Sequence, residues 1–193
     1  NVVVQSYINY FGEMAMAGAG AYAKIEGFAF LPITSFTMAL TTFVGQNLGA
    51  GDYERTRKGA RFGTICSLIL AELIGVVIYI TAPQLIAAFD HTPEVIAYGT
   101  DRARACALFY CLLAFSHAMA SILRGAGKAM VPMLIMLAFW CIVRVSILAV
   151  SGMLFRTIAT VNWVYPITWS LSSVAFLIYY RHFSFEQSEQ KKV

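Results

Sequence analysis

Charged residues are scarce in this chain of 193 residues, where Asp, Glu, Lys and Arg together make up 12% of the sequence. Soluble domains carry about 25% charged residues. Hydrophobic residues make up 59%, and the many Phe, Tyr and Trp residues add apolar surface rather than charge. So little charge cannot solvate a globule of this size, which excludes a soluble domain. The composition predicts an integral membrane protein of the all-α class with several spans.

Motifs for enzyme chemistry and nucleotide binding are also missing. The chain has no paired carboxylates, no Ser/His/Asp spacing and no HExxH motif. A P-loop needs a glycine five residues before Gly-Lys-Ser/Thr, but Ile122 stands there and Ala129 follows Lys128. The net charge of +4 comes from residues that flank apolar runs, so it does not indicate a nucleic-acid partner. We expect neither an enzyme nor a nucleic-acid-binding protein, and no catalytic residues.

The four cysteines, Cys66, Cys106, Cys111 and Cys141, form no CxxC or Cys/His pattern. All four lie inside apolar runs, where cysteine packs as a small hydrophobic residue. We therefore expect buried packing residues rather than a metal or redox site, and no bound cofactor.

The chain does contain a series of apolar runs separated by short polar connections. Full spans are predicted at residues 21–44, 62–82, 93–123, 130–154 and 163–180, and the first of these could begin a turn or two earlier. The connections fall at residues 12–20, 83–92 and 155–162, with Thr92 and Pro93 as a helix start. Residues 1–11 would cover only roughly 16 Å as a helix, against a hydrocarbon core of about 30 Å. We expect a membrane helix bundle over residues 1–193, with about five full spans plus a partial first helix that begins in a longer chain.

Basic residues alternate between the two sides of this predicted bundle. One side holds Arg55, Arg57, Lys58, Arg61, Arg124, Lys128, Arg181, Lys191 and Lys192. The other side holds Arg102, Arg104 and Arg156. By the positive-inside rule, the two basic turns and the C-terminus are expected in the cytoplasm.

Glycine-rich turns are predicted where the chain leaves the membrane on the basic side. Residues 43–51 read FVGQNLGAG and residues 124–128 read RGAGK. Glycine permits the backbone conformations that end a helix, and Asp52 can cap the next one. The residues assigned to these structural turns are Gly45, Gln46, Asn47, Gly49, Arg124, Gly125 and Gly127.

Polar residues inside the predicted spans are candidates for a substrate or ion cavity, because such residues face protein or water rather than lipid. Glu26, Thr34, Thr37 and Thr41 share one face of a helix. Glu26 could equally be a structural partner of Lys24 or of another helix. We expect Glu72 to be a structural partner or a neutral acid, Arg144 to tie helices together and His117 to be a hydrogen-bonded packing residue. The full set assigned to the cavity is Gln5, Asn9, Lys24, Glu26, Thr34, Thr37, Thr41, Tyr110 and His117.

Several motifs together resemble one known family. They are Lys24-Ile25-Glu26 with Phe28, Phe30 and Pro32; the GQNLGAG turn; Arg57-Lys58-Gly59; Thr92-Pro93-Glu94-Val95-Ile96; and the RGAGK turn after Leu123. In this order they are similar to the C-terminal half of a multidrug and toxic compound extrusion (MATE) transporter. The resemblance implies twelve helices in two six-helix lobes, with this chain as the partial seventh to the twelfth helix. It also implies a missing N-terminal lobe as partner, and efflux of drugs or metabolites across the plasma membrane, driven by protons or sodium ions.

The resemblance has one departure. Some family members carry acids in the seventh and tenth helices for ion coupling, whereas residues 105–123 contain none. Two other functions remain open at this point. A lipid-linked oligosaccharide flippase would need a larger and more cationic cavity, and a non-transporting membrane assembly subunit would use its polar residues only to join helices. The partners expected in the leading case are a small-molecule substrate and the lipid bilayer.

Overall fold

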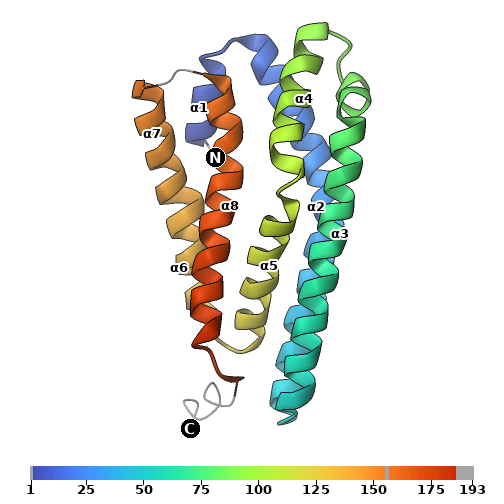
Figure 1. Cartoon of the computed structure of the whole chain (residues 1–193), viewed down its shortest axis with the longest axis vertical. Helices are drawn as coiled ribbons and strands as arrows, with labels where there is room; N and C mark the ends of the chain where they lie inside the picture. The colour runs from blue at the N-terminus through green and yellow to red at the C-terminus, as the bar shows by residue number, and fades with distance from the viewer. Residues whose placement is uncertain (1, 155–156, 186–193) are drawn as a thin grey trace.

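The computed structural model of the chain describes residues 2–154 and 157–185, and this part is helical with short connections (Figure 1). Its elements are α1 (Val2–Asn9), α2 (Glu13–Gly49), α3 (Tyr53–Ala87), α4 (Pro93–Ala107), α5 (Tyr110–Gly125), α6 (Met130–Leu137), the π-helix η1 (Ala138–Val143), α7 (Arg144–Leu154) and α8 (Ile158–Arg181). Four helical segments of the described part are long and apolar enough to cross a membrane, or five when the bent pair α4 and α5 counts as one span. The predicted all-α membrane bundle is confirmed.

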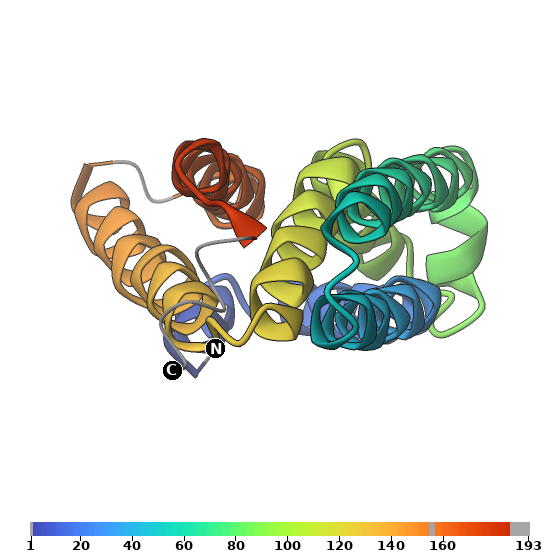
Figure 2. The same cartoon turned by 90° about the horizontal axis from the view of Figure 1, so that it is seen from below.

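The helix ends gather at two ends of an elongated bundle (Figure 1). The α2–α3 turn, the α5–α6 turn and the end of α8 lie together at the lower end, which we call the basic end. The α1–α2 and α3–α4 connections lie at the opposite end. Seen along the bundle, α2 and α3 pack with α4 and α5 on one side, while α6, α7 and α8 lie on the other (Figure 2). The two basic turns thus share one end, as the alternation of charge predicts.

The two basic turns have the same backbone structure. At the end of α2, Gly51 has a φ of 73°, and the amides of Gly51 and Asp52 donate to the carbonyls of Leu48 and Asn47. At the end of α5, Gly127 has a φ of 77°, and its amide and the next one along the chain make the corresponding two bonds. These are Schellman motifs, in which a residue in the left-handed region ends the helix.

The four residues assigned to the first turn lie at the end of α2 rather than after it. Gly45, Gln46, Asn47 and Gly49 are all helical, although the carbonyls of Gln46 and Asn47 accept the amides of Ala50 and Asp52 where the helix ends. The left-handed conformation falls on Gly51 instead. Gly125 is likewise the last residue of α5 rather than part of the turn, and only Gly127 of the assigned glycines takes the left-handed conformation.

Helix α2 begins about two turns before residue 21, at the early limit of the expected range. Residues 12–20 were predicted as a connection, but α2 starts at Glu13, directly after Gly12 with a φ of 93°. The segment is rich in alanine and methionine, which are strong helix formers, so its small residues do not break the helix. Two other helices are also longer than predicted. Helix α3 continues through Pro83 to Ala87, and α8 begins at Ile158.

The predicted single helix over residues 93–123 is broken. Helices α4 and α5 meet at an angle of 54° around Leu108 and Phe109. The break frees backbone groups that lipid cannot hydrogen-bond. One of them, the amide of Cys111, donates to Glu72 Oε2 of α3 at 3.3 Å. This bond confirms Glu72 as a structural partner.

The start of α4 is confirmed, although its capping differs from the expectation. Thr92 is the N-cap and Pro93 the first helical residue, but the Thr92 side chain makes no capping bond. Its amide instead donates to Asp90 Oδ1 at 2.8 Å, and this bond holds the pKa of the Asp90 carboxyl below its usual value. The α3–α4 connection is therefore ordered by Asp90.

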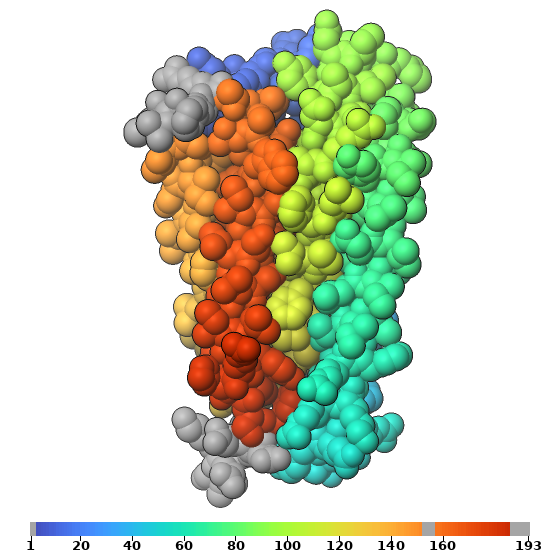
Figure 3. All heavy atoms as spheres, viewed as in Figure 1, coloured from blue at the N-terminus to red at the C-terminus, as the bar shows by residue number. Residues whose placement is uncertain are grey.

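The outer surface of the bundle is strongly apolar. Phe28, Met38 and Phe62 are each about 70% exposed on α2 and α3. The face seen in Figure 3 is formed by α8, α4, α5 and α3. Further exposed apolar side chains on α3 and α8 include Ile69, Leu73, Leu171 and Val174. In water such a continuous apolar surface is unfavourable, whereas in a bilayer it lies against lipid.

Candidate functional site

A cavity of about 180 Å³ lies between α1, α2, α4 and α8, in the half of the bundle away from the basic end. We call it the interhelical cavity. Its lining residues are Val4, Gln5, Ile8, Ala19, Tyr22, Ala23, Glu26, Arg102 and Tyr165. Two of the residues assigned to a cavity from the sequence, Gln5 and Glu26, are therefore among those that line it.

Glu26 is the acid of the cavity and belongs to a chain of hydroxyl groups. Tyr22, one turn earlier on α2, donates its hydroxyl to Glu26 Oε1 at 3.1 Å. The same hydroxyl lies 3.0 Å from the hydroxyl of Tyr110 on α5. Tyr110 is fully buried and does not line the cavity, so it contributes by positioning Tyr22. This series of hydroxyl groups links the cavity to the start of α5.

Arg102 is the cation of the cavity, although it was not among the residues assigned to one. It was placed with Arg104 on the less basic side of the bundle, within the helix that starts at Pro93, but its side chain is only 8% exposed and lines the cavity from α4. Its Nη1 donates to Asn162 Oδ1 of α8 at 3.4 Å. Its guanidinium carbon lies 4.8 Å from the ring centre of Tyr165 and 5.7 Å from that of Tyr22.

Arg144 ties α7 to α8, as predicted. Its Nη2 donates to the Thr168 hydroxyl at 2.8 Å, and its guanidinium lies 4.3 Å from the ring centre of Tyr165. Tyr165 therefore contacts two buried guanidinium groups, Arg102 and Arg144. Cation–π contacts of this kind partly compensate a desolvated charge.

The other residues assigned to a cavity lie outside the lining of the interhelical cavity. The hydroxyls of Thr34, Thr37 and Thr41 each donate to a backbone carbonyl of α2 itself. Lys24 is exposed, with its Nζ 5.1 Å from the ring centre of Phe89. Asn9 is exposed and accepts a bond from Gln5 Nε2 at 3.2 Å.

His117 is packed between aromatic rings, with centroid distances of 5.4 Å to Phe30 and 5.3 Å to Trp140. Its packing role is confirmed. The predicted hydrogen bond is not found at Nε2, which is buried without a partner among the described residues. His117 thus joins α5 to α2 and η1 through ring contacts.

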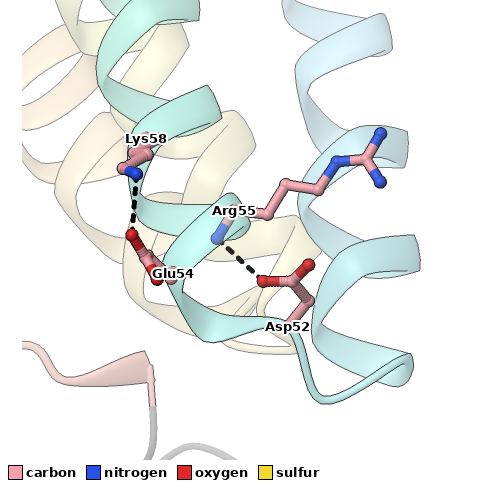
Figure 4. Close-up of polar contacts among 4 residues, drawn as sticks. All are labelled: Asp52, Glu54, Arg55 and Lys58. Atoms are coloured by element: carbon pink, nitrogen blue, oxygen red, sulfur yellow. Dashed lines mark hydrogen bonds and ion pairs between the residues drawn. The ribbon is translucent and has the colours of Figure 1, made fainter.

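A larger open hollow of about 590 Å³ lies at the basic end, around the start of α3. Figure 4 shows its charged residues: Lys58 pairs with Glu54 at 2.7 Å, and the Arg55 amide donates to Asp52. Asp52 is thus the N-cap of α3, as predicted. The paired side chains are about 78% exposed, so the hollow is a solvated surface rather than a pocket that isolates a ligand.

The described residues contain no group of three His, Cys, Asp or Glu side chains placed to hold a metal ion. Their cysteines are all free. Cys106 is buried as expected, but Cys141 is exposed on η1, so the prediction of burial is wrong for it. The Cys141 side chain lies at the outer surface of the bundle.

Comparisons with known proteins point to one family. The family model described as MatE matches residues 1–150. A probable multidrug resistance protein NorM from Thermotoga maritima is 32% identical over 128 residues, which is 63% of this chain and 28% of the relative. The probable multidrug resistance protein YoeA from Bacillus subtilis is 24% identical over 93% of this chain and 39% of its own length. The chain thus spans well under half the length of these curated relatives.

Solved structures share the fold over the full chain. The MATE transporter ClbM in complex with Rb⁺ matches 100% of this chain and 45% of its own, with a TM-score of 0.89 at 22% identity. A mutant of the Vibrio cholerae MATE transporter VcmN matches 94% of this chain and 42% of its own, with a TM-score of 0.82 at 20% identity. The resemblance found in the sequence motifs is confirmed.

Proposed function

We propose, from the premise that this chain belongs to the MatE family, that it forms one lobe of a secondary efflux transporter. The observation that carries the proposal is the family match over residues 1–150. The relatives named as multidrug resistance proteins are more than twice as long as this chain, which supports a second lobe as partner. In this proposal the two lobes export a small molecule against an inward flow of protons or sodium ions.

The interhelical cavity supplies the chemistry for this function. Glu26 is a carboxylate in a membrane-spanning helix, where an ionisable residue needs a partner, water, an ion or a proton. Among the described residues it has one hydrogen bond, from Tyr22, and it borders a cavity with room for several water molecules. A carboxylate in this setting can exchange a proton or cation for a cationic group of the substrate. Glu26 thereby compensates for the acid that residues 105–123 do not provide.

The two alternatives have less support. A flippase for lipid-linked oligosaccharides gains one argument, because Arg102 adds a cation to the cavity. A cavity of about 180 Å³ is nevertheless small beside an oligosaccharide headgroup. A non-transporting assembly subunit has no use for a cavity lined by an acid and a cation that form no ion pair with each other in the described part of the chain.

The function is tested by dye efflux from proteoliposomes in which the complete transporter is reconstituted. We expect ethidium efflux that requires an imposed proton or sodium gradient, and no efflux from the chain of 193 residues reconstituted alone. Absence of gradient-driven export by the complete transporter would contradict the proposal. Efflux by the single lobe would contradict the requirement for a second one.

The membrane orientation is tested by cysteine labelling of the complete transporter in intact cells. In a background without native cysteines, Ala88→Cys in the α3–α4 connection should react with an impermeant maleimide, and Ala50→Cys at the α2–α3 turn should not. Neither alanine is buried, so burial does not bias the comparison. The physical reason is that the basic end is retained in the cytoplasm. Labelling of Ala50→Cys from outside would reverse the proposed topology, including the cytoplasmic C-terminus.

A further inference from the structure

Arg102 is a buried cation that its surroundings do not satisfy. A guanidinium has five N–H donors. Among the described residues its one hydrogen bond goes to a neutral amide oxygen, that of Asn162, at 3.4 Å. Its Nε is buried without a partner. Removing a charge from water costs several kcal/mol unless an opposite charge and hydrogen bonds compensate it.

Glu26, the acid of the cavity, does not compensate the charge of Arg102 by a direct ion pair. Glu26 and Arg102 both line the cavity, yet no ion pair within 4.0 Å joins them in the described part of the chain. Arg144 adds a second buried guanidinium beside Tyr165, and its Nε also lacks a hydrogen-bond partner among the described residues. In this region the described residues thus place two guanidinium groups and one carboxylate, which leaves one positive charge without a counter-charge.

The shape of the cavity fits an anionic group on an aromatic compound. Tyr22 and Tyr165 present their rings beside Arg102, and Val4 and Ile8 of α1 add apolar walls. A guanidinium fork binds carboxylate and phosphate through paired hydrogen bonds. The open space of about 180 Å³ is large enough for such a group and the ring that carries it.

We propose that the interhelical cavity binds a carboxylate or phosphate group on Arg102, with the rings of Tyr22 and Tyr165 as aromatic walls. The inference rests on the proposed transport function and names a substrate class for it, namely aromatic compounds with an anionic group. Glu26, across the same cavity, receives the cationic part of a zwitterion or, when the bound group is purely anionic, a proton.

The test compares two dyes that differ only at the anionic group: a rhodamine with a free carboxylate and the methyl ester of the same rhodamine. Binding to the complete transporter is measured by fluorescence polarisation in phosphatidylcholine nanodiscs. Arg102→Gln should weaken binding of the carboxylate dye about tenfold, as expected for a lost charge-assisted hydrogen bond. It should leave binding of the ester nearly unchanged or tighter. Arg104→Gln, two residues away on α4 with an exposed side chain against Tyr79, is the matched control and should change neither affinity.

Two further variants keep the test decisive if Arg102→Gln does not fold. Arg102→Lys retains the charge but not the fork of donors, so it should keep part of the preference for the carboxylate dye. Both dyes carry a cationic ring system, which Glu26 receives, so Glu26→Gln should weaken binding of the ester, whose only charge is that cation, more than binding of the zwitterionic carboxylate dye. Equal loss of both dyes in Arg102→Lys, a greater loss of the carboxylate dye than of the ester in Glu26→Gln, or wild-type protein that binds neither dye or both equally would overturn the inference.

A second arm identifies the source of the anionic group. If a lipid headgroup occupies Arg102, adding phosphatidylglycerol to the nanodiscs should displace the carboxylate dye from wild type. If a solute is the occupant, the added lipid should have no effect. Either result supports an anion site at Arg102. Binding in nanodiscs is measured without an ion gradient. Failure of the anion site therefore shows in the binding test, and failure of the proposed transport function shows in the efflux test.

Discussion

Replacing Glu26 by glutamine is expected to lower the efflux of a cationic dye by about tenfold per folded transporter, the size of one charge-assisted interaction. Glu26 is the one acid among the residues that line the interhelical cavity. Glutamine has nearly the same shape, and its carbonyl oxygen can still accept the Tyr22 hydroxyl. The substitution therefore removes the charge while the packing between α1, α2 and α4 is retained.

The measurement is ethidium efflux from proteoliposomes over a range of pH, normalised to the amount of folded protein. Wild-type efflux should depend on pH, and the Glu26→Gln variant should lose most of that dependence together with the rate. Glu13→Gln, an exposed acid on the same helix, controls for a general effect of lost charge. Tyr22→Phe retains the carboxylate and removes only its hydrogen bond, so it should reduce efflux less. Unchanged efflux per folded molecule in Glu26→Gln would remove Glu26 from the site.

The spans and the basic end could be read from the sequence because they depend on composition and on the placement of Lys and Arg. Element boundaries could not. The break between α4 and α5 contains no proline or glycine, and helix-forming residues surround it. It is stabilised by α3, where Glu72 accepts the freed Cys111 amide, and such a tertiary contact leaves no local signal.

The candidate site was predicted only in part. Glu26 was found because a carboxylate inside an apolar run is itself a signal. Arg102 was missed because two other charged residues, Asp101 and Arg104, lie beside it in the sequence of α4. A signal was nevertheless available, since Val95, Gly99, Arg102 and Cys106 fall on one helical face and all four are buried. The threonines of α2 do not line the cavity, because a threonine hydroxyl can donate to a carbonyl of its own helix and then needs no polar surroundings.

The largest loss of stability is expected from Gly75→Ala, because Gly75 brings α3 into direct contact with the backbone at the end of α4. A Cβ at this position would lie 2.2 Å from the carbonyl oxygen of Ala107. This oxygen belongs to the backbone and not to a flexible side chain, so the two helices must separate to admit the methyl group. Small residues that allow close approach are a main source of helix association in membranes. Overpacking of this kind costs about 1–3 kcal/mol and sometimes more.

Separation of α3 from α4 also disturbs the bent region between α4 and α5. Glu72 lies one turn before Gly75 on α3, so its bond to the Cys111 amide should lengthen when the helices move apart. The complete transporter carrying Gly75→Ala should therefore unfold at a lower temperature in detergent, as followed by tryptophan fluorescence. Gly27→Ala is the matched control, because a Cβ there has nothing within 4 Å and alanine favours a helix by about 1 kcal/mol over glycine. If Gly75→Ala and Gly27→Ala unfold at the same temperature, α3 and α4 do not depend on this contact.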